Sequence, residues 1–403
     1  MLKSGFILAV GSLLGFLANF SLSILLEKNS FGEIFTLFTL ISILSIAAPF
    51  GTNLFFVMHR DIYFRHAREI VLFPVLVSVS ISLVFLVVSF SFFNLAFAFL
   101  LVVSALSIQG IMVGQIRQDG IQVATLQSLQ PFIKSIAATA VLVGAVMGVA
   151  EQTKLHILAV SLFVSCAIAL ALVLAWLVGA RSSREVSTSF FFREFSVRNW
   201  VSLGSFWMSS VLGMAYSFGI IPLVSYFHGY EYSAYLGVYF IFWSGSNVLI
   251  TMLINNHFWP KCCALRSIDV SDRAVIFESL RASFLLAFLT LAGMVIFALF
   301  LSDLFWSEYS GISAFLGILS IAIFFRTLSA WLGMMILASD DLISKKFRVQ
   351  LGMTVVMALA VAAINISSTI ELAWIMVSLE VGYFVGYFAY SIRVLREKYF
   401  QAL

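Results

Sequence analysis

Runs of about twenty apolar residues, separated by short polar segments, recur along almost the whole chain. A helix needs about twenty predominantly apolar residues to cross the hydrocarbon core of a bilayer. Hydrophobic residues make up 62% of the 403 residues. Charged residues make up only 10%, compared with about 25% in soluble domains. Membrane β-barrel strands alternate polar and apolar residues, and these runs do not. The sequence therefore predicts an all-α polytopic membrane protein.

Charges, glycines or prolines bound each apolar run, and together they predict twelve transmembrane helices. The predicted spans are 5–26, 34–57, 70–91, 93–113, 122–149, 156–179, 201–226, 235–258, 279–301, 312–338, 350–367 and 372–392. The longest internal loop, at 180–199, divides them six and six. We therefore expect a six-helix lobe at 1–180, a linker at 181–199 and a second six-helix lobe at 200–403.

The placement of basic residues predicts the orientation of the chain. If the N-terminus is cytoplasmic, 19 of the 23 lysines and arginines fall in cytoplasmic segments and only Lys28 and Lys154 in outside loops. Cytoplasmic loops of membrane proteins carry such an excess of Lys and Arg. The outside loops carry acids instead, among them Glu151 and Glu231. We expect both termini in the cytoplasm, and the net charge of +4 then reflects topology and not nucleic-acid binding.

Three charged residues lie inside apolar spans: Lys134, Arg326 and Glu380. A charge at the bilayer centre costs about 2.5–3.5 kcal/mol on insertion scales, so it usually has a partner or a function. Arg326 lies deep in its span, and its planar guanidinium suits bidentate binding of phosphate or a sugar acid. It also has a structural alternative, an ion pair with Glu380. Glu380 is either that counter-ion or a carboxylate that binds a coupling H⁺ or Na⁺. Lys134 is the second candidate cavity cation for binding substrate. Its alternative is that Pro131 starts the span, in which case Lys134 reaches the cytoplasmic headgroups.

The two halves of the chain resemble each other in layout. Residues 30–60 and 231–261 both contain a short outside loop, a span and a basic inside segment. Residues 105–120 and 327–342 are a second related pair, which places Asp119 opposite Asp341. Transporters built from such repeats bind substrate at the interface between the repeats.

Three segments resemble a known family: FGEIFTLFTLISILSIAAPFG (31–51), RNWVSLGSFWMSSVLGMAYSFGIIPLVSYFHGYEYSAYLGVYFI (198–241) and HFWPKC (257–262). They are similar to the Wzx-type O-antigen or oligosaccharide flippases of the multidrug/oligosaccharidyl-lipid/polysaccharide (MATE-like) superfamily. The resemblance implies a V-shaped, two-lobed bundle in a bacterial inner membrane that works by alternating access. It further implies a cargo of undecaprenyl-diphosphate-linked oligosaccharide for surface polysaccharide (O-antigen, capsule or exopolysaccharide), carried from the cytoplasmic to the periplasmic leaflet. Its partners would be this lipid-linked oligosaccharide, the phospholipid bilayer, and a polysaccharide polymerase and chain-length regulator.

In that family the first, second, seventh and eighth helices line the cleft, so the resemblance makes their polar residues candidates for binding sugar hydroxyls. The asparagines among them are Asn19, Asn53, Asn247 and Asn255. Interhelical hydrogen bonding is the alternative for these residues. The tyrosines around 226–239, among them Tyr226, Tyr235 and Tyr239, fit an interfacial aromatic belt, with stacking on sugar rings as the alternative.

Two other functions compete with the flippase interpretation. A cation-coupled multidrug exporter of the related branch would favour embedded carboxylates over embedded cations. A non-transporting scaffold or enzyme subunit is the third alternative. The sequence contains no Walker A, HExxH or GxSxG motif, so we expect no enzyme, no catalytic residue, no metal site and no cofactor.

Overall fold

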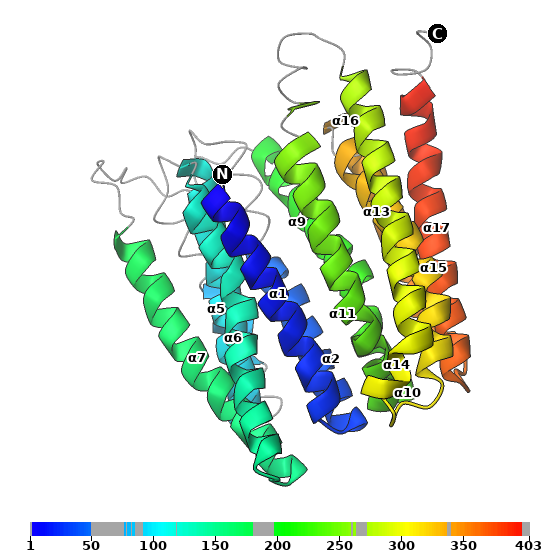
Figure 1. Cartoon of the computed structure of the whole chain (residues 1–403). Coiled ribbons are helices and arrows are strands. Elements are labelled where there is room, and N and C mark those ends of the chain that lie inside the picture. The colour runs from blue at the N-terminus through cyan, green and yellow to red at the C-terminus, as the bar shows by residue number, and fades with distance from the viewer. Residues whose placement is uncertain are drawn as a thin grey trace. The chain divides into compact units, whose positions relative to one another are not determined.

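The computed structural model describes residues 2–49, 76–77, 79–81, 83–84, 92–117, 119–179, 197–258, 261–262, 272–336 and 340–396. By their contacts they form two units, Met1–Pro222 and Leu223–Leu403 (Figure 1). The first unit contains α1 (Leu2–Leu25), α2 (Lys28–Ala47), α5 (Phe92–Arg117), α6 (Gly120–Val146), α7 (Glu151–Gly179) and α9 (Val197–Phe218). The helix α10 (Ile220–His228) begins at the end of the first unit. The second unit contains α11 (Tyr230–Leu253), the π-helix η1 (Ile254–Phe258), α13 (Arg273–Phe300), α14 (Ser302–Phe305), α15 (Ile312–Trp331), the π-helix η2 (Leu332–Ile336), α16 (Asp340–Ala363) and α17 (Thr369–Leu395).

The predicted fold class is confirmed. Nine of the described helices are long and apolar enough to cross a membrane, or ten if the bent pair α9 and α10 is one span. The described residues form helices and no strand, as expected where lipid cannot satisfy backbone groups and helices must do so internally. Each predicted span overlaps a described helix except 70–91, of which only a few residues are described; residues 50–57 of the span 34–57 also lie outside the described residues. Most of the predicted linker 181–199 also lies outside the described residues, and the predicted lobe boundary stays a prediction.

Several helices begin earlier than the apolar pattern predicts, so some expected loop residues are helical. Helix α2 begins at Lys28 and α11 at Tyr230. The acids Glu151, Glu231 and Glu371 therefore stand in the first turns of α7, α11 and α17. Unsatisfied N–H groups give a helix N-terminus a partial positive charge, which carboxylates stabilise. The acids expected in outside loops thus stand where they stabilise the N-terminal ends of these helices.

The first unit is held together at one end by contacts between its turns. The backbone N–H of Glu27, between α1 and α2, donates to Glu151 Oε1 over 2.9 Å. Lys154 Nζ donates to the carbonyl of Leu25 over 3.0 Å and lies 3.3 Å from Glu151 Oε2. The α1–α2 turn and the α6–α7 turn, both predicted to be outside, are therefore at the same end of this unit.

Helices α1 and α6 pack in parallel along a seam of small residues (Figure 1). A Cβ added to Gly11 would lie 2.5 Å from Ser128 Cβ, and one added to Gly15 would lie 3.2 Å from Pro131 Cβ. Ser128 Oγ also donates to the carbonyl of Ile7 over 3.1 Å. Small residues let helix backbones approach closely in membranes. The seam fixes the register of the two helices, with Gly15 opposite Pro131.

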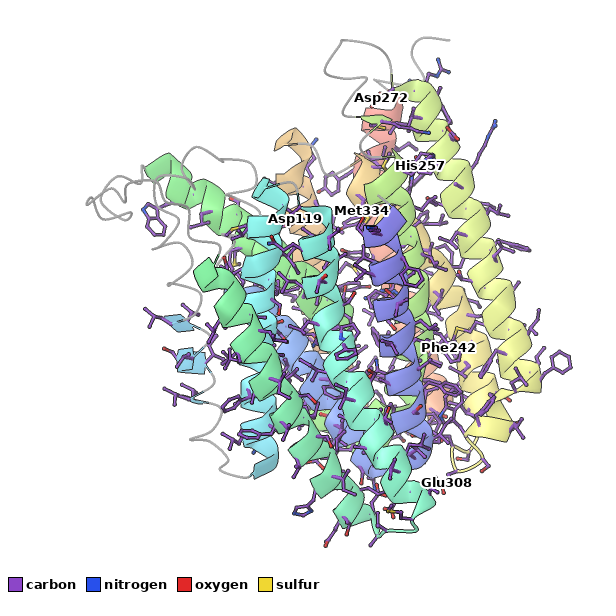
Figure 2. All side chains as sticks on the ribbon, turned by 60° about the vertical axis from the view of Figure 1, so that its left-hand side comes forward. Asp119, Phe242, His257, Asp272, Glu308 and Met334 are labelled. Carbon is purple, nitrogen blue, oxygen red and sulfur yellow. The ribbon has the colours of Figure 1, made fainter. Side chains whose placement is uncertain are left out.

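The second unit shows the same arrangement of its ends. His228 Nε2 bonds the carbonyl of Val361 over 2.8 Å, and Tyr235 Oη donates to the carbonyl of Ser310 over 2.8 Å. The turns before α11, α15 and α17 therefore gather at one end. Figure 2 shows Glu308 at this end, and His257, Asp272 and Met334 at the other.

Equivalent helices pack together in the two units. In the first unit α5 packs against α2 and α7, and in the second α15 packs against α11 and α17. These are the second, fourth and sixth predicted helices of each half. Asp119 caps α6 through the N–H groups of Ile121 and Gln122, and α16 begins at Asp340 in the corresponding place. The shared packing supports the repeat inferred from the sequence; the side chain of Asp341 lies outside the described residues.

Candidate functional site

Lys134 lies near the middle of a continuous helix. Helix α6 runs unbroken through Pro131, with 14 residues before Lys134 and 12 after it. At about 1.5 Å per residue, the Cα atom of Lys134 is roughly 18–21 Å from either end of the helix. Pro131 therefore does not start this helix, which extends over most of the predicted span 122–149. Lys134 is about as deep in α6 as Arg326 is in the span 312–336 formed by α15 and η2, where 14 residues precede Arg326 and ten follow it.

The ammonium of Lys134 has only an aromatic partner among the described residues. Its Nζ lies 4.1 Å from the ring centroid of Phe38 on α2. The ring of Phe38 packs at a tilt against the buried Phe97 of α5, with the ring centroids 5.3 Å apart. No described carboxylate pairs with Lys134. A cation–π contact contributes about 0.5–2 kcal/mol, less than the ~2.5–3.5 kcal/mol that a charge costs at this depth.

Two further polar groups lie at the level of Lys134. The register set by Gly15 and Pro131 brings Asn19 level with residue 135, and Asn19 Oδ1 is buried with no hydrogen-bond partner in the described part of the chain. Gln130 precedes Lys134 by one helical turn, and its Nε2 is likewise buried without a described partner. Buried polar groups are normally hydrogen-bonded. Gln130 was not among the residues singled out from the sequence, although its i, i+4 spacing to Lys134 was visible there.

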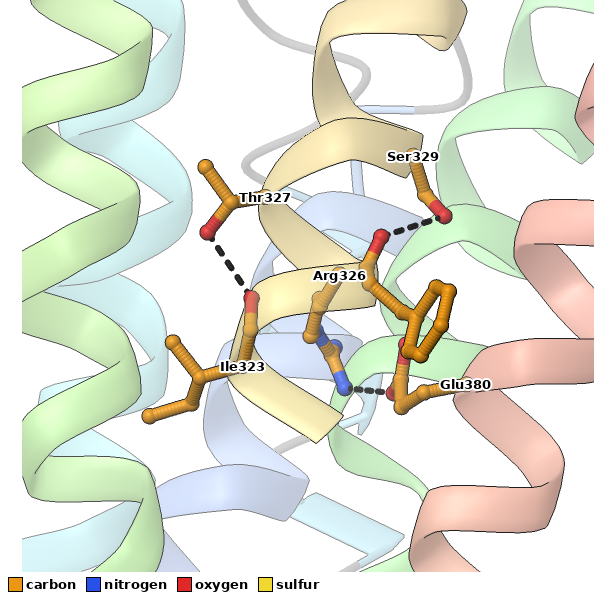
Figure 3. Close-up of polar contacts among 6 residues, drawn as sticks. Ile323, Arg326, Thr327, Ser329 and Glu380 are labelled. Atoms are coloured by element: carbon orange, nitrogen blue, oxygen red, sulfur yellow. Dashed lines mark hydrogen bonds and ion pairs between the residues drawn. The ribbon is translucent and has the colours of Figure 1, made fainter. Parts of the chain in front are cut away.

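Arg326 and Glu380 form a buried ion pair in the second unit. Arg326 Nη1 donates to Glu380 Oε1 over 2.5 Å, and the two residues are 6% and 1% exposed. Figure 3 shows the guanidinium of α15 meeting the carboxylate of α17. Of the two partners considered for Arg326, Glu380 is the one that this structure contains. Binding of substrate by Arg326 stays a prediction.

Aromatic rings cover the guanidinium of Arg326. Its Cζ lies 4.1 Å from the ring centroid of Trp243 and 5.5 Å from that of Phe240, both on α11. The hydroxyl of Tyr239 is close to both charged groups but outside hydrogen-bonding geometry. Tyr235 and Tyr239 are fully buried, whereas Tyr226 is 82% exposed. The predicted aromatic belt is thus wrong for these two buried tyrosines, because α11 begins early and carries them into the core.

The remaining candidates are dispersed. Asn247 is partly buried on α11. Asn53 and the side chain of Asn255 lie outside the described residues. The described structure therefore brings Arg326 together with Glu380, and Asn19 level with Lys134.

The fold resembles that of known transporters. A MATE transporter in complex with MaD5 matches with a TM-score of 0.58 at 12% identity, covering 97% of this chain and 94% of that chain. The Vibrio cholerae MATE transporter VcmN, as a point mutant, matches with a TM-score of 0.57 at 12% identity, covering 98% and 99%. A MOP superfamily transporter from Pyrococcus furiosus, whose binding pocket is described as having reverse polarity, matches with a TM-score of 0.55 at 11% identity, covering 96% and 93%.

No protein-family model and no curated protein matches the sequence. The chain is a multi-pass helical membrane protein with the fold of MATE and MOP superfamily transporters.

Proposed function

We propose that the chain is a flippase that moves an anionic lipid-linked oligosaccharide, of the undecaprenyl-diphosphate type, from the cytoplasmic to the periplasmic leaflet of a bacterial inner membrane by alternating access. The fold supports transport. The observation that carries the anionic cargo is Lys134, a mid-span cation for which the described structure contains no carboxylate. The proposal of a lipid-linked sugar as the cargo rests on the family resemblance of residues 31–51, 198–241 and 257–262.

The chemistry of Lys134 suits a phosphate. Its ammonium has three N–H donors, and the Phe38 ring can face only part of them. Lys binds phosphate as a compact point charge. The buried amide groups of Asn19 and Gln130, at the same level, offer hydrogen-bonding capacity for a sugar or phosphate oxygen.

The competing proposal is a multidrug exporter for cationic drugs. Such a cargo would need an embedded carboxylate that is free to bind it. Glu380 is the mid-span acid of this chain, and its charge is already balanced by Arg326. The charge balance of the described spans therefore favours an anionic cargo.

Complementation of a deletion strain tests the proposal. Deletion is expected to abolish surface glycan, to leave lipid-linked repeat units on the inner leaflet and to leave drug sensitivity unchanged. Lys134→Ala should lower export at normal protein levels by about tenfold or more, since a charge-assisted bond to phosphate is worth roughly 1.5–3 kcal/mol. Lys134→Arg should retain most of the export because the charge remains.

The matched control is Lys3→Ala, which removes an exposed lysine from α1 and should export normally. Normal surface glycan in the deletion strain, with no second flippase present, would refute the flippase function. Full export by a normally expressed Lys134→Ala protein would refute the role of Lys134 alone.

A further inference from the structure

The buried face of α17 changes character at Glu380. Before Glu380 every buried side chain of this helix is apolar: Leu372, Ala373, Met376, Val377 and Leu379. After it, as far as Ile392, every buried side chain carries a hydroxyl: Tyr383, Tyr387 and Ser391. These three residues follow Glu380 at i+3, i+7 and i+11, which places all four on one face of the helix. We call Glu380, Tyr383, Tyr387 and Ser391 the polar column.

Two hydroxyls of the polar column, those of Tyr383 and Tyr387, are hydrogen-bonded to each other. Tyr383 Oη and Tyr387 Oη are 2.6 Å apart, and either can be the donor. Tyr383 also bonds the side chain of Gln350 on α16. Such a pair can transmit a proton in either direction, because each oxygen can accept one proton as it releases another.

The polar column leads to the basic end of the unit. The ring of Tyr387 packs against Gly333 in η2, where an added Cβ would lie 3.0 Å from the ring. Lys346, on the Gln350 face of α16, donates from Nζ to the carbonyl of Gly333 over 3.2 Å. Toward the other end, the buried side chains of α15 before Arg326 are apolar apart from Ser320, whose hydroxyl is used locally on Gly317. On α15 and α17 the buried polar groups therefore extend from Glu380 mainly toward the Lys346 end, whereas on α11 the buried Tyr239 and Tyr235 lie toward the opposite end.

Glu380 has a free acceptor at the end of the polar column. Oε1 receives Arg326, whereas Oε2 is buried and has no hydrogen-bond partner among the described residues. An unpaired carboxylate oxygen in an apolar site is unfavourable, and protonation would turn it into a donor. The charged and titratable groups around it are Arg326 from α15, Tyr239 from α11, Tyr383 and Tyr387 from α17 and, farther along, Lys346 from α16.

We propose that Glu380 is a proton-binding site loaded through Tyr387 and Tyr383 from the end of the unit that carries Lys346. A proton from water bonds to Tyr387 Oη, whose own proton passes to Tyr383 Oη, and the proton of Tyr383 passes to Glu380 Oε2. Each hydroxyl breaks one O–H bond and forms another, and the carboxylate gains one proton and loses its charge. Arg326 then loses its counter-ion and becomes available to an anion.

The proton would be the ion that drives the proposed transport. This inference therefore rests on the proposed flippase function. Na⁺ is the alternative ion. A sodium ion at Oε2 would lie within a few ångströms of the Arg326 guanidinium and would be repelled by it, whereas a proton neutralises the carboxylate.

Infrared spectroscopy of the full chain in nanodiscs tests the proton site without any cargo. Lowering the pH from about 8 to about 5, where perturbed carboxyl groups titrate, should produce a carboxylic acid C=O band that Glu380→Gln removes. Glu278→Gln, which alters an exposed acid of α13, should keep that band. If Glu380→Gln does not fold, Glu380→Asp should shift the band, and Arg326→Gln/Glu380→Gln, which removes both charges, should remove it.

Rapid-scan spectra after a pH jump test the route. Tyr383→Phe and Tyr387→Phe should each slow the rise of the band about tenfold, equivalent to ~1.4 kcal/mol on the barrier, with the same end point. The matched control is Tyr390→Phe, which removes a more exposed hydroxyl of the same helix and should leave the rate unchanged. The proposal is overturned if no band depends on residue 380, if both tyrosine variants load at the wild-type rate, or if Na⁺ at constant pH replaces the proton. Loss of export with an intact band would instead contradict only the proposed function.

Discussion

At the scale of single residues, the three mid-span charges have different surroundings. Arg326 has a carboxylate and two aromatic rings, Glu380 has a guanidinium on one oxygen only, and Lys134 has a ring and no described carboxylate. Their depths are similar, so depth alone does not distinguish a structural charge from a functional one. The partner of each charged group is what distinguishes a structural charge from a functional one.

The ion pair predicts non-additive mutational effects on stability. Arg326→Gln should destabilise the purified protein by ~3 kcal/mol or more, because it leaves a buried carboxylate unpaired. Adding Glu380→Gln should recover much of that loss, since the double variant leaves no uncompensated charge. Thermal unfolding of the single and double variants in detergent measures both effects. Additive losses in the double variant would show that the two side chains do not stabilise each other.

The sequence identified these charged residues but did not decide which partners they contact. Each charge stood out because it interrupted an apolar run. The ion pair of Arg326 with Glu380 was one of two alternatives that the sequence left open. These positions are 54 residues apart, and helical periodicity carries no information on which helices pack together. The depth of Lys134 stayed open in the sequence because Pro131 could also start the span, whereas in the structure α6 continues through Pro131.

At the scale of helices, the α1–α6 seam has almost no free space at Gly11. Gly11→Ala should destabilise the protein by about 1–3 kcal/mol, as overpacking generally does, since the new Cβ would meet both Ser128 Cβ and the Ser128 backbone. Gly5→Ala, on the same helix with nothing within 4 Å of the new Cβ, is the matched control. Thermal unfolding of the two variants measures the difference. An equally stable Gly11→Ala protein would mean that the helices are not so closely packed.

Hydropathy predicted which segments form helices, but it did not predict where the helices begin and end. Apolar runs predict the part of a helix that faces lipid. They miss the polar first turns, such as residues 28–33 of α2, which are helical although they are not apolar. The sequence shows hydroxyl-bearing residues at helical spacing after Glu380 on α17. Only the structure shows that these residues are buried.

At the scale of the whole molecule, the contacts among turns make the predicted topology testable. Single cysteines at Glu151 and Glu231 should react with a membrane-impermeant thiol reagent added from the periplasm. Cysteines at Arg65, Arg193 and Lys345 should react only after the membrane is opened. The expectation follows from the excess of Lys and Arg in the predicted cytoplasmic segments. The Glu151 and Glu231 variants must agree, because each lies at the end of its unit where the outside turns gather; protection of Glu231Cys from the periplasm would contradict the six-plus-six division.

The different charge balance of the two units has an electrical consequence. In the described parts, Arg326 and Glu380 together add no net charge to the middle of their unit, whereas Lys134 adds one positive charge to the middle of its own. A membrane potential exerts about 2.3 kcal/mol per elementary charge per 100 mV. A rearrangement that moves Lys134 along the membrane normal is therefore voltage-sensitive when the site is empty, and one that moves the ion pair as a unit is not. The diphosphate of the proposed cargo carries two negative charges, so its binding beside Lys134 would reverse the sign of the moving charge. The resting potential would then act in opposite senses on the empty and the loaded steps.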